Sequence, residues 1–257
     1  MVDYQIFDRP EVLRVLFHPR RDNSTPRGGV HSIAVEVEPG IKVGGRLYPT
    51  NGPTAPAILF FHGNGEIAAD YDYIAPLFGQ LGVNLLVIDY RGYGSSDGTP
   101  TVSNTVKDAV TVFAALGGIF NSHGLFPEQV YVMGRSLGSV SAIEITLQAG
   151  DKLAGLIIES GFADTLGLLG RLGFPVTGLD PEMDKIGNGS KMTQIKTKTL
   201  IIHGEEDSLI PAAQGEKLYH NCAASSKQLV LIPSAGHNDL LMVGTKQYLG
   251  AIKSFID

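Results

Sequence analysis

The sequence predicts an α/β fold: a mostly parallel sheet with helices on both faces and an antiparallel hairpin at its start. Six short apolar runs recur from Ala57 onward, and segments with helical spacing or composition separate them. Strands that are covered on both faces appear as continuous apolar runs, and strands alternating with helices pair in parallel through right-handed crossovers. Ahead of these runs, two alternating segments joined by Pro39-Gly40 indicate the hairpin.

The predicted elements follow one another without a linker or repeat that would divide the chain. The strands are expected at 31–37, 41–48, 57–61, 84–89, 129–134, 153–159, 199–203 and 229–232, and the helices at 66–81, 104–116, 136–149, 211–222 and 239–255. Tyr71 and Tyr73 fall in the first helix, where we expect both to be buried. The long connection after Glu159 carries Leu166, Leu169 and Leu172 at helical spacing. We therefore expect a single domain, 1–257, with a small cap or lid insertion at 160–197.

Composition excludes several classes of function. With 43% hydrophobic and 18% charged residues, the 257-residue chain can build a packed core. The net charge of −6 argues against a nucleic-acid partner, and no apolar run approaches the ~18 residues of a membrane span. The N-terminus lacks the features of a signal peptide. The single cysteine, Cys222, is expected to be a packed side chain and fits a reducing compartment, so we expect a cytoplasmic protein. Oligomeric state stays open.

A serine stands between two glycines directly after the predicted strand 129–134. In "VMGRSLGS", Ser136 is flanked by Gly134 and Gly138 and precedes a predicted helix. A tight strand-to-helix turn holds a serine hydroxyl above the sheet, and glycines remove the Cβ atoms that would clash there. The string alone does not separate such a nucleophile from an ordinary glycine-rich helix start.

Two further chemical groups follow later strands. Asp207 lies in the acidic loop after 199–203, where Glu205 and Glu206 are alternative candidates, and His237 lies in the turn-rich loop after 229–232. A carboxylate can fix the tautomer of an imidazole, and an imidazole, with an ordinary pKa near ~6.5, suits proton transfer. The chain order Ser136, Asp207, His237 is that of a hydrolase triad.

The loop after the predicted strand 57–61 reads His62-Gly63-Asn64-Gly65. Acyl transfer passes through an oxyanion that backbone N–H groups stabilise best. The N–H of Leu137, next after the serine, and that of Asn64 are the candidate oxyanion donors. We expect His62 to order this loop rather than to react.

Two other interpretations use the same residues. The segment 63–68 also matches the G-x-G-x-x-A fingerprint of dinucleotide binding, with Asp89 at the end of the next strand, which would suit an NAD(P)-dependent oxidoreductase. That motif follows a hairpin instead of the first strand of the fold, and this interpretation gives no role to Ser136, Asp207 and His237. A catalytically silent protein of the same fold that binds a ligand is the other alternative.

The successive motifs "FFHGNGE", "VIDYRGYGSSDGTPT", "VYVMGRSLGS", "TLIIHGEEDSLIP" and "SAGHNDLL" resemble those of the α/β-hydrolase superfamily over nearly the whole chain. Within it the sequence is similar to ABHD13/ABHD17-like serine hydrolases and to bacterial serine aminopeptidase-like (S33-type) hydrolases. The resemblance implies Ser136 as nucleophile, His237 as base, Asp207 as acid, and Asn64 and Leu137 as oxyanion donors. The cysteine-rich N-terminus of some ABHD17-like depalmitoylases is missing here, which argues against lipidated protein substrates.

The expected reaction is two-step acyl transfer through an acyl-enzyme, without a metal or organic cofactor. Phe162, Leu166 and Leu169 are expected to line an apolar acyl pocket, which favours small-molecule esters or thioesters of short to medium acids. The alternative for these three residues is that they only seat the cap. Amide hydrolysis of the aminopeptidase kind on the same triad ranks below ester hydrolysis, because the insertion offers no obvious carboxylate pair for gripping a peptide amino terminus.

Overall fold

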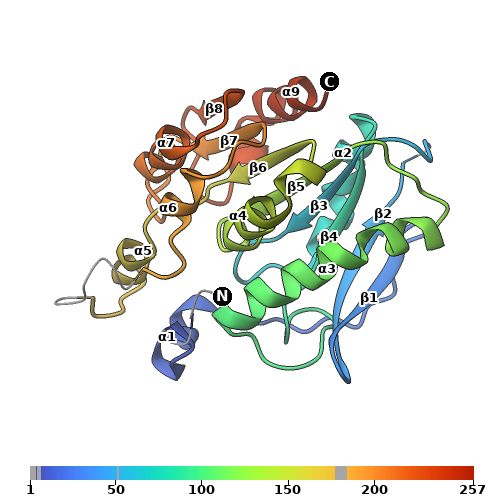
Figure 1. The fold of residues 1–257 in the computed structure, drawn as a ribbon, viewed down its shortest axis with the longest axis horizontal. Helices are drawn as coiled ribbons and strands as arrows, with labels where there is room; N and C mark the ends of the chain where they lie inside the picture. The colour runs from blue at the N-terminus through green and yellow to red at the C-terminus, as the bar shows by residue number, and fades with distance from the viewer. Residues whose placement is uncertain (1–3, 5–6, 51, 177–183) are drawn as a thin grey trace.

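An eight-stranded sheet forms the centre of the molecule (Figure 1). The computed structural model describes residues 4, 7–50, 52–176 and 184–257. In these residues the strands are β1 (His31–Glu38), β2 (Ile41–Tyr48), β3 (Ala57–Phe61), β4 (Asn84–Ile88), β5 (Val130–Arg135), β6 (Gly155–Glu159), β7 (Thr199–Gly204) and β8 (Lys227–Ile232).

The strand order is β1-β2-β4-β3-β5-β6-β7-β8. The hairpin β1-β2 is antiparallel and joins β4 in antiparallel register, whereas every pair from β4 to β8 is parallel. In the central pair, Phe61 lies beside Gly134, so β3 and β5 end at the same edge of the sheet. The mostly parallel sheet with an antiparallel N-terminal hairpin is therefore confirmed.

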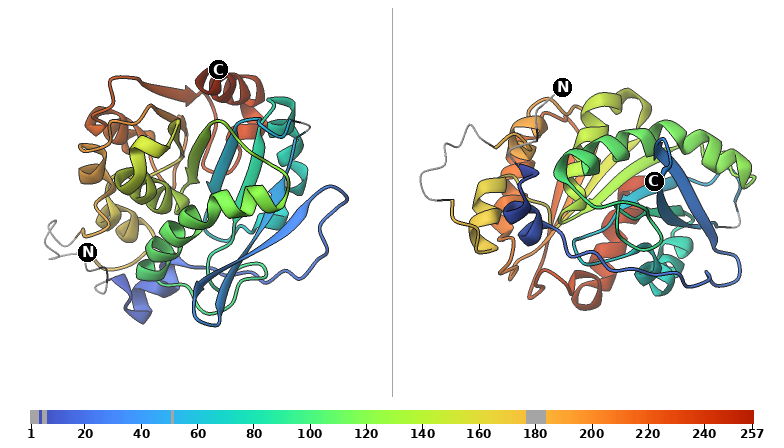
Figure 2. Two further views of the ribbon diagram at one scale, coloured as in Figure 1. Left: turned by 45° about the vertical axis from the view of Figure 1, so that its right-hand side comes forward. Right: turned by 90° about the horizontal axis from the view of Figure 1, so that it is seen from below.

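Helices cover both faces of this sheet. One face carries α3, α4 and α7 with the short helices α1, α5 and α6; the other carries η2, α2, α8 and α9. Figure 2 (right) shows α3 and α4 on one side of the sheet and α2 and α9 on the other. The bounds are α1 (Pro10–Leu16), η2 (Ala68–Tyr73), α2 (Ala75–Gln80), α3 (Val102–Ser122), α4 (Gly138–Ala149), η3 (Gly150–Lys152), α5 (Thr165–Arg171), α6 (Asn188–Met192), α7 (Ala212–Asn221), α8 (Leu240–Val243) and α9 (Thr245–Ile256).

The apolar runs are buried on both sides because alternate residues of a strand point to opposite faces. In β3, Leu59 and Phe61 join the core beneath α3 and α4, while Ile58 and Phe60 join the core beneath α2 and α9. All four side chains are at most 1% exposed. Uninterrupted apolar runs thus follow from a sheet that has no solvent-facing side in its middle.

The predicted helix 66–81 is wrong in detail, because it divides into the 3-10 helix η2 and the short helix α2, which has a proline in its first turn. The expectation that Tyr71 and Tyr73 are both buried is also wrong: Tyr71 is 4% exposed and Tyr73 is 72% exposed. Residues two apart in a helix lie on opposite faces, so they cannot share one buried interface. The ring of Tyr73 instead lies under the guanidinium of Arg27.

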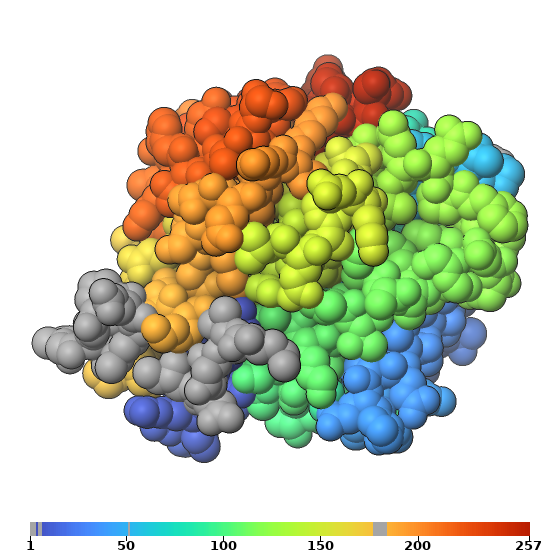
Figure 3. Space-filling model, in the orientation of Figure 1, coloured from blue at the N-terminus to red at the C-terminus, as the bar shows by residue number. Residues whose placement is uncertain are grey.

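The insertion expected at 160–197 contains α5 and α6, while its residues 177–183 lie outside the described part of the chain. Asp164 begins α5 as its N-cap, because its carboxylate accepts a hydrogen bond from the N–H of Gly167. α6 packs against α4 and α7. Figure 3 shows α3 (green), α4 (yellow-green) and the residues from 184 onward (orange) side by side on one face of the molecule.

Cys222 is buried, as expected for a packed small side chain. In the described ranges, no helix is long and apolar enough to cross a membrane.

Candidate active site

The carboxyl ends of β3, β5, β7 and β8 meet at one edge of the sheet, and a predicted site residue follows each of these strands. Asn64 follows β3, Ser136 follows β5, Asp207 follows β7 and His237 follows β8. Parallel strands that share a sheet present their C-terminal loops on the same side, so residues more than 170 positions apart converge there.

Ser136 occupies a strained turn between β5 and α4. Its φ of +51° lies in the left-handed region, which is costly for a residue with a side chain and is held here by the surroundings. Its N–H donates to the carbonyl of Glu159 at 2.8 Å. A Cβ on Gly134 would meet the carbonyl of Gly138, and one on Gly138 would meet the carbonyl of Phe61. The two glycines therefore permit the close backbone approach that raises the serine above the sheet.

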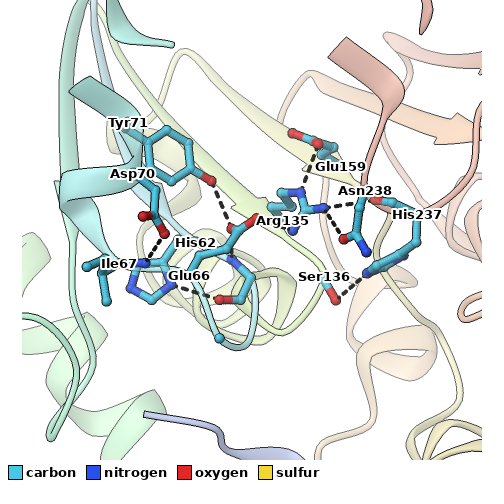
Figure 4. Close-up of polar contacts among 12 residues, drawn as sticks. His62, Glu66, Ile67, Asp70, Tyr71, Arg135, Ser136, Glu159, His237 and Asn238 are labelled. Atoms are coloured by element: carbon cyan, nitrogen blue, oxygen red, sulfur yellow. Dashed lines mark hydrogen bonds and ion pairs between the residues drawn. The ribbon is translucent and has the colours of Figure 1, made fainter. Parts of the chain in front are cut away.

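His237 links Ser136 to Asp207 through its two ring nitrogens. Nε2 lies 3.1 Å from Ser136 Oγ, and Nδ1 lies 2.7 Å from Asp207 Oδ2. With Nδ1–H donating to the carboxylate, Nε2 is the nitrogen that can accept the serine proton. The contact to Ser136 is drawn in Figure 4.

Both carboxylate oxygens of Asp207 are fixed by hydrogen bonds. Its Oδ1 accepts hydrogen bonds from the N–H groups of Leu209 at 3.0 Å and Ile210 at 2.7 Å, which leaves Oδ2 for the imidazole. Its side chain has no exposed area, whereas the alternatives Glu205 and Glu206 are exposed. The loop geometry thus directs only one of its three carboxylates toward His237.

A second imidazole lies behind this carboxylate. His203 is fully buried, and its Nε2 lies 3.3 Å from Asp207 Oδ2 and 2.7 Å from the carbonyl of Ile210. Burial alone raises the pKa of Asp207, but hydrogen bonds from His203, His237 and the Ile210 N–H outweigh it and hold that pKa well below its ordinary value. Asp207 is therefore ionised at every pH near neutrality.

The loop after β3 fixes the orientation of the Asn64 N–H. The carbonyl of Gly63 lies 2.9 Å from His62 Nδ1 and accepts a hydrogen bond from the N–H of Glu66 at 3.2 Å. The N–H of Asn64 belongs to the same trans peptide and so points the opposite way. Among the described residues, no protein acceptor binds the N–H of Asn64 or of Leu137. Both donors remain available for a bound oxyanion.

Asp89, which suggested dinucleotide binding, instead contacts the segment that follows β3. The carboxylate of Asp89 accepts a hydrogen bond from the N–H of Ala68 at 2.8 Å and lies 3.2 Å from His62 Nε2. Burial lowers the pKa of His62, but the neighbouring Asp89 carboxylate outweighs that effect and the pKa is raised. Both residues are buried, so Asp89 is bound inside the protein rather than open to a ribose.

The three residues expected to line an acyl pocket occupy different places. Phe162 lines a cavity of about 200 Å³ between α5 and the loop after β7, whose other walls include Leu168, Leu209 and Ile210. Leu166 lines a neighbouring hollow with a more polar wall. Leu169 is 1% exposed and belongs to the core. The structure does not bring these three together around one pocket.

The sequence motifs did not indicate a role for Arg135, which lies directly before Ser136 and is only 8% exposed. Its side chain reaches both the loop after β3 and the loop after β8 (Figure 4). The one signal for it in the sequence is a charged residue at the end of an otherwise apolar strand.

The sheet order, the left-handed serine turn after β5 and the position of the later loops are those of an α/β-hydrolase fold. Two family models match the chain: "Serine aminopeptidase, S33" over residues 52–166 and "Serine hydrolase (FSH1)" over residues 132–238. The two matched ranges overlap over residues 132–166, which include Ser136, and together they include all four site residues described above.

Three known proteins are similar to this chain. An uncharacterised protein of Mycobacterium tuberculosis is 30% identical over 93% of this chain and 82% of its own length. Alpha/beta hydrolase domain-containing protein 17B of Homo sapiens is 33% identical over 77% of this chain and 65% of its own. An esterase of Pyrococcus furiosus superposes with a TM-score of 0.73 at 17% identity, covering 94% of this chain and 97% of that one. The chain belongs to the α/β-hydrolase family and is a serine hydrolase, which confirms the resemblance read from its motifs.

Proposed function

We propose that this protein is a carboxylic ester or thioester hydrolase that works through a Ser136-His237-Asp207 triad and an acyl-enzyme. The observation that carries the proposal is the pair of contacts made by His237, 3.1 Å to the serine hydroxyl and 2.7 Å to the aspartate. His237 takes the proton of Ser136 as the hydroxyl attacks the substrate carbonyl, and Asp207 stabilises the imidazolium. The N–H groups of Asn64 and Leu137 bind the oxyanion.

The second half of the reaction uses the same groups. His237 returns the proton to the leaving alcohol or thiol, and water then attacks the acyl-enzyme with His237 again as base. The chemistry of these residues requires no metal or organic cofactor. The substrate is a small molecule, and we propose the segment 160–197 as the cap that shapes its site.

The cavity of about 200 Å³ between α5 and the loop after β7 favours a substrate with a short to medium, apolar acyl group. Its walls include Phe162, Leu168 and Ile210, and the N–H of Ile210 binds Asp207. One wall belongs to the loop that holds Asp207, and this shared loop is what links the cavity to the triad in the proposal. Esterases with this fold, such as the Pyrococcus furiosus enzyme, support the same class of reaction.

Aminopeptidase activity is the second candidate, because one matched family model carries that description. An aminopeptidase needs a free carboxylate for the substrate ammonium. Three carboxylates near the triad are already bound: Glu66 and Glu159 to Arg135, and Asp207 to His237. Ester and thioester hydrolysis therefore ranks first.

Labelling with a fluorophosphonate tests the proposal directly. The reagent is expected to phosphonylate Ser136, and peptide mass spectrometry identifies the modified residue. A panel of acyl esters, acyl thioesters and aminoacyl amides with graded acyl lengths then defines the substrate class. Absence of labelling on folded protein contradicts serine hydrolysis, and amide turnover above ester turnover replaces the esterase assignment by the peptidase one.

Activity is expected to fall in acid through a single protonation, that of the imidazole base. Because the pKa of Asp207 lies well below its ordinary value, the carboxylate stays ionised throughout and does not contribute a second step. Because a protonated imidazole cannot accept the serine proton, kcat/KM for an activated ester should be lower in acid than at neutral pH. The measurement runs from pH 5 to 9 with circular dichroism at each pH. A flat profile from a folded enzyme contradicts a histidine base.

A further inference from the structure

Arg135 places a buried positive charge between the loops that carry the candidate oxyanion donor and the candidate base. It is the last residue of β5 and precedes Ser136 directly. Figure 4 shows its guanidinium between Glu66 on one side and His237 with Asn238 on the other.

Three nitrogens of this guanidinium donate to four acceptors. Nη1 donates to Glu66 Oε1 at 2.5 Å, and Nε donates to Glu159 Oε1 at 3.1 Å. Nη2 donates to the main-chain carbonyl of His237 at 2.8 Å and to Asn238 Oδ1 at 2.9 Å. One side chain thus connects the loops after β3 and β8 with the end of β6.

The two carboxylates are themselves fixed by their other oxygens. Glu66 Oε2 accepts hydrogen bonds from the N–H of Gly63 at 2.7 Å and the hydroxyl of Tyr71 at 3.0 Å. Glu159 Oε2 accepts a hydrogen bond from the hydroxyl of Tyr248 at 2.7 Å. Burial lowers the pKa of Arg135, but Glu66 and Glu159 outweigh it and raise that pKa. The guanidinium is therefore a permanent charge that four hydrogen bonds hold in place.

The position of Gly63 shows independently how closely the Arg135 guanidinium and the Glu66 carboxylate approach the loop after β3. A Cβ at Gly63 would lie 2.5 Å from Arg135 Nη1 and 3.1 Å from Glu66 Oε2. A side chain at this position would displace the guanidinium or the carboxylate. The glycine before Asn64 is thus explained by the arginine as well as by the turn.

We propose that Arg135 is a positioning residue that holds the base and the oxyanion donor in register with Ser136. It fixes the main chain of His237 directly. Through Glu66 it fixes the Gly63 N–H, and so the start of the peptide that carries the Asn64 N–H. This inference rests on the proposed function, because it assigns Arg135 to the same reaction.

The geometry requires arginine rather than any cation. The acceptors lie in different directions around the guanidinium plane, and a planar fork donates to all of them at once. A lysine ammonium is a single point charge on a flexible chain and cannot reach the same acceptors. Lysine should therefore keep the charge but lose the positioning.

Arg135→Met is expected to lower kcat for an activated ester about 10- to 100-fold while KM changes less than about twofold, because small displacements of reacting groups cost up to about 10²-fold in rate. Arg135→Lys is expected to recover less than about a tenth of the lost kcat. Arg91→Met is the matched control. Arg91 is also buried and pairs with Asp108 at 2.7 Å, but it makes no contact with the triad residues. It is expected to lower stability and to leave kcat per folded molecule unchanged.

If Arg135→Met does not fold, Glu66→Gln tests the positioning role of Arg135 instead. This variant is expected to fold, because the Glu66 side chain is 27% exposed and glutamine keeps its size. A fall in kcat of at least about fivefold supports the proposal, and an unchanged kcat overturns it. Full recovery by Arg135→Lys, or an equal kcat loss in Arg91→Met, also overturns it. Ser136→Ala, measured in parallel, separates the proposed function from the positioning role of Arg135. If Ser136→Ala stays active, the proposed function fails. If Ser136→Ala is inactive while the Arg135 and Glu66 variants keep their kcat, only the role of Arg135 fails.

Discussion

Ser136→Ala is expected to lower kcat for an activated ester by about 10⁶-fold, the scale seen when a triad nucleophile is removed. The residual rate comes from substrate binding and the oxyanion donors. The fold should persist, because the contact that fixes the turn is the N–H of residue 136 donating to the carbonyl of Glu159, which alanine keeps. Stopped-flow or plate assays of p-nitrophenyl esters, with urea unfolding as the stability measurement, check both parts.

Ser160→Ala is the matched control for this change. Ser160 also has a positive φ, +46°, and follows the neighbouring strand β6 at the same edge. In the described ranges its buried hydroxyl has no hydrogen-bond partner. Its removal should leave kcat within about twofold, because surface and unbonded groups outside the chemistry change little. Comparable losses in the two variants would mean that the serine turn, and not the hydroxyl of Ser136, is what matters.

Asp207→Asn is expected to lower kcat by about 10⁴-fold, the effect known for this change in serine-protease triads. The reason lies in the hydrogen bonds of Oδ1. The N–H groups of Leu209 and Ile210 must face the amide oxygen, so the amide nitrogen faces His237 Nδ1. Nδ1 of His237 then accepts a hydrogen bond from the amide, so the imidazole carries its own proton on Nε2 and cannot take the serine proton there. Steady-state kinetics measure the loss.

Glu205→Gln and Glu206→Gln are the controls, since both lie in the same loop and remove the same charge. Both residues are exposed, and the contact to the imidazole is made by Asp207 instead. Each is expected to retain kcat within about twofold, as exposed substitutions usually do. If either matched Asp207→Asn, the triad acid would be assigned to the wrong residue.

Much of the fold was predictable because burial on two faces leaves a strong pattern in a strand. The run "AILFF" has no polar position to face water, and β3 indeed has none exposed. Helix boundaries were harder. The segment 66–81 has helical composition throughout, yet it divides into η2 and α2, since packing decides whether a continuous helix fits. The same segment shows why Tyr73 was misplaced: composition does not tell which face of a short helix meets the core.

The candidate site was predictable to the extent that topology dictates it. Residues that directly follow parallel strands must share one edge, so Ser136, Asp207 and His237 could be grouped from their places after β5, β7 and β8. The substrate pocket was not predictable in this way. Phe162, Leu166 and Leu169 were chosen by apolar character, which core packing and ligand binding both require, and only Phe162 lines the cavity by the acid loop.

The sequence by itself determined the α/β class, the order of the strands along the chain and the residue types that chemistry needs at their carboxyl ends. Those features are recorded in periodicity and local motifs. Only the tertiary structure decided which carboxylate faces His237, that His203 lies behind it, and that Arg135 connects Glu66 with the loop of His237. These are contacts between side chains from separate strands, and they depend on distances and directions that no local pattern records.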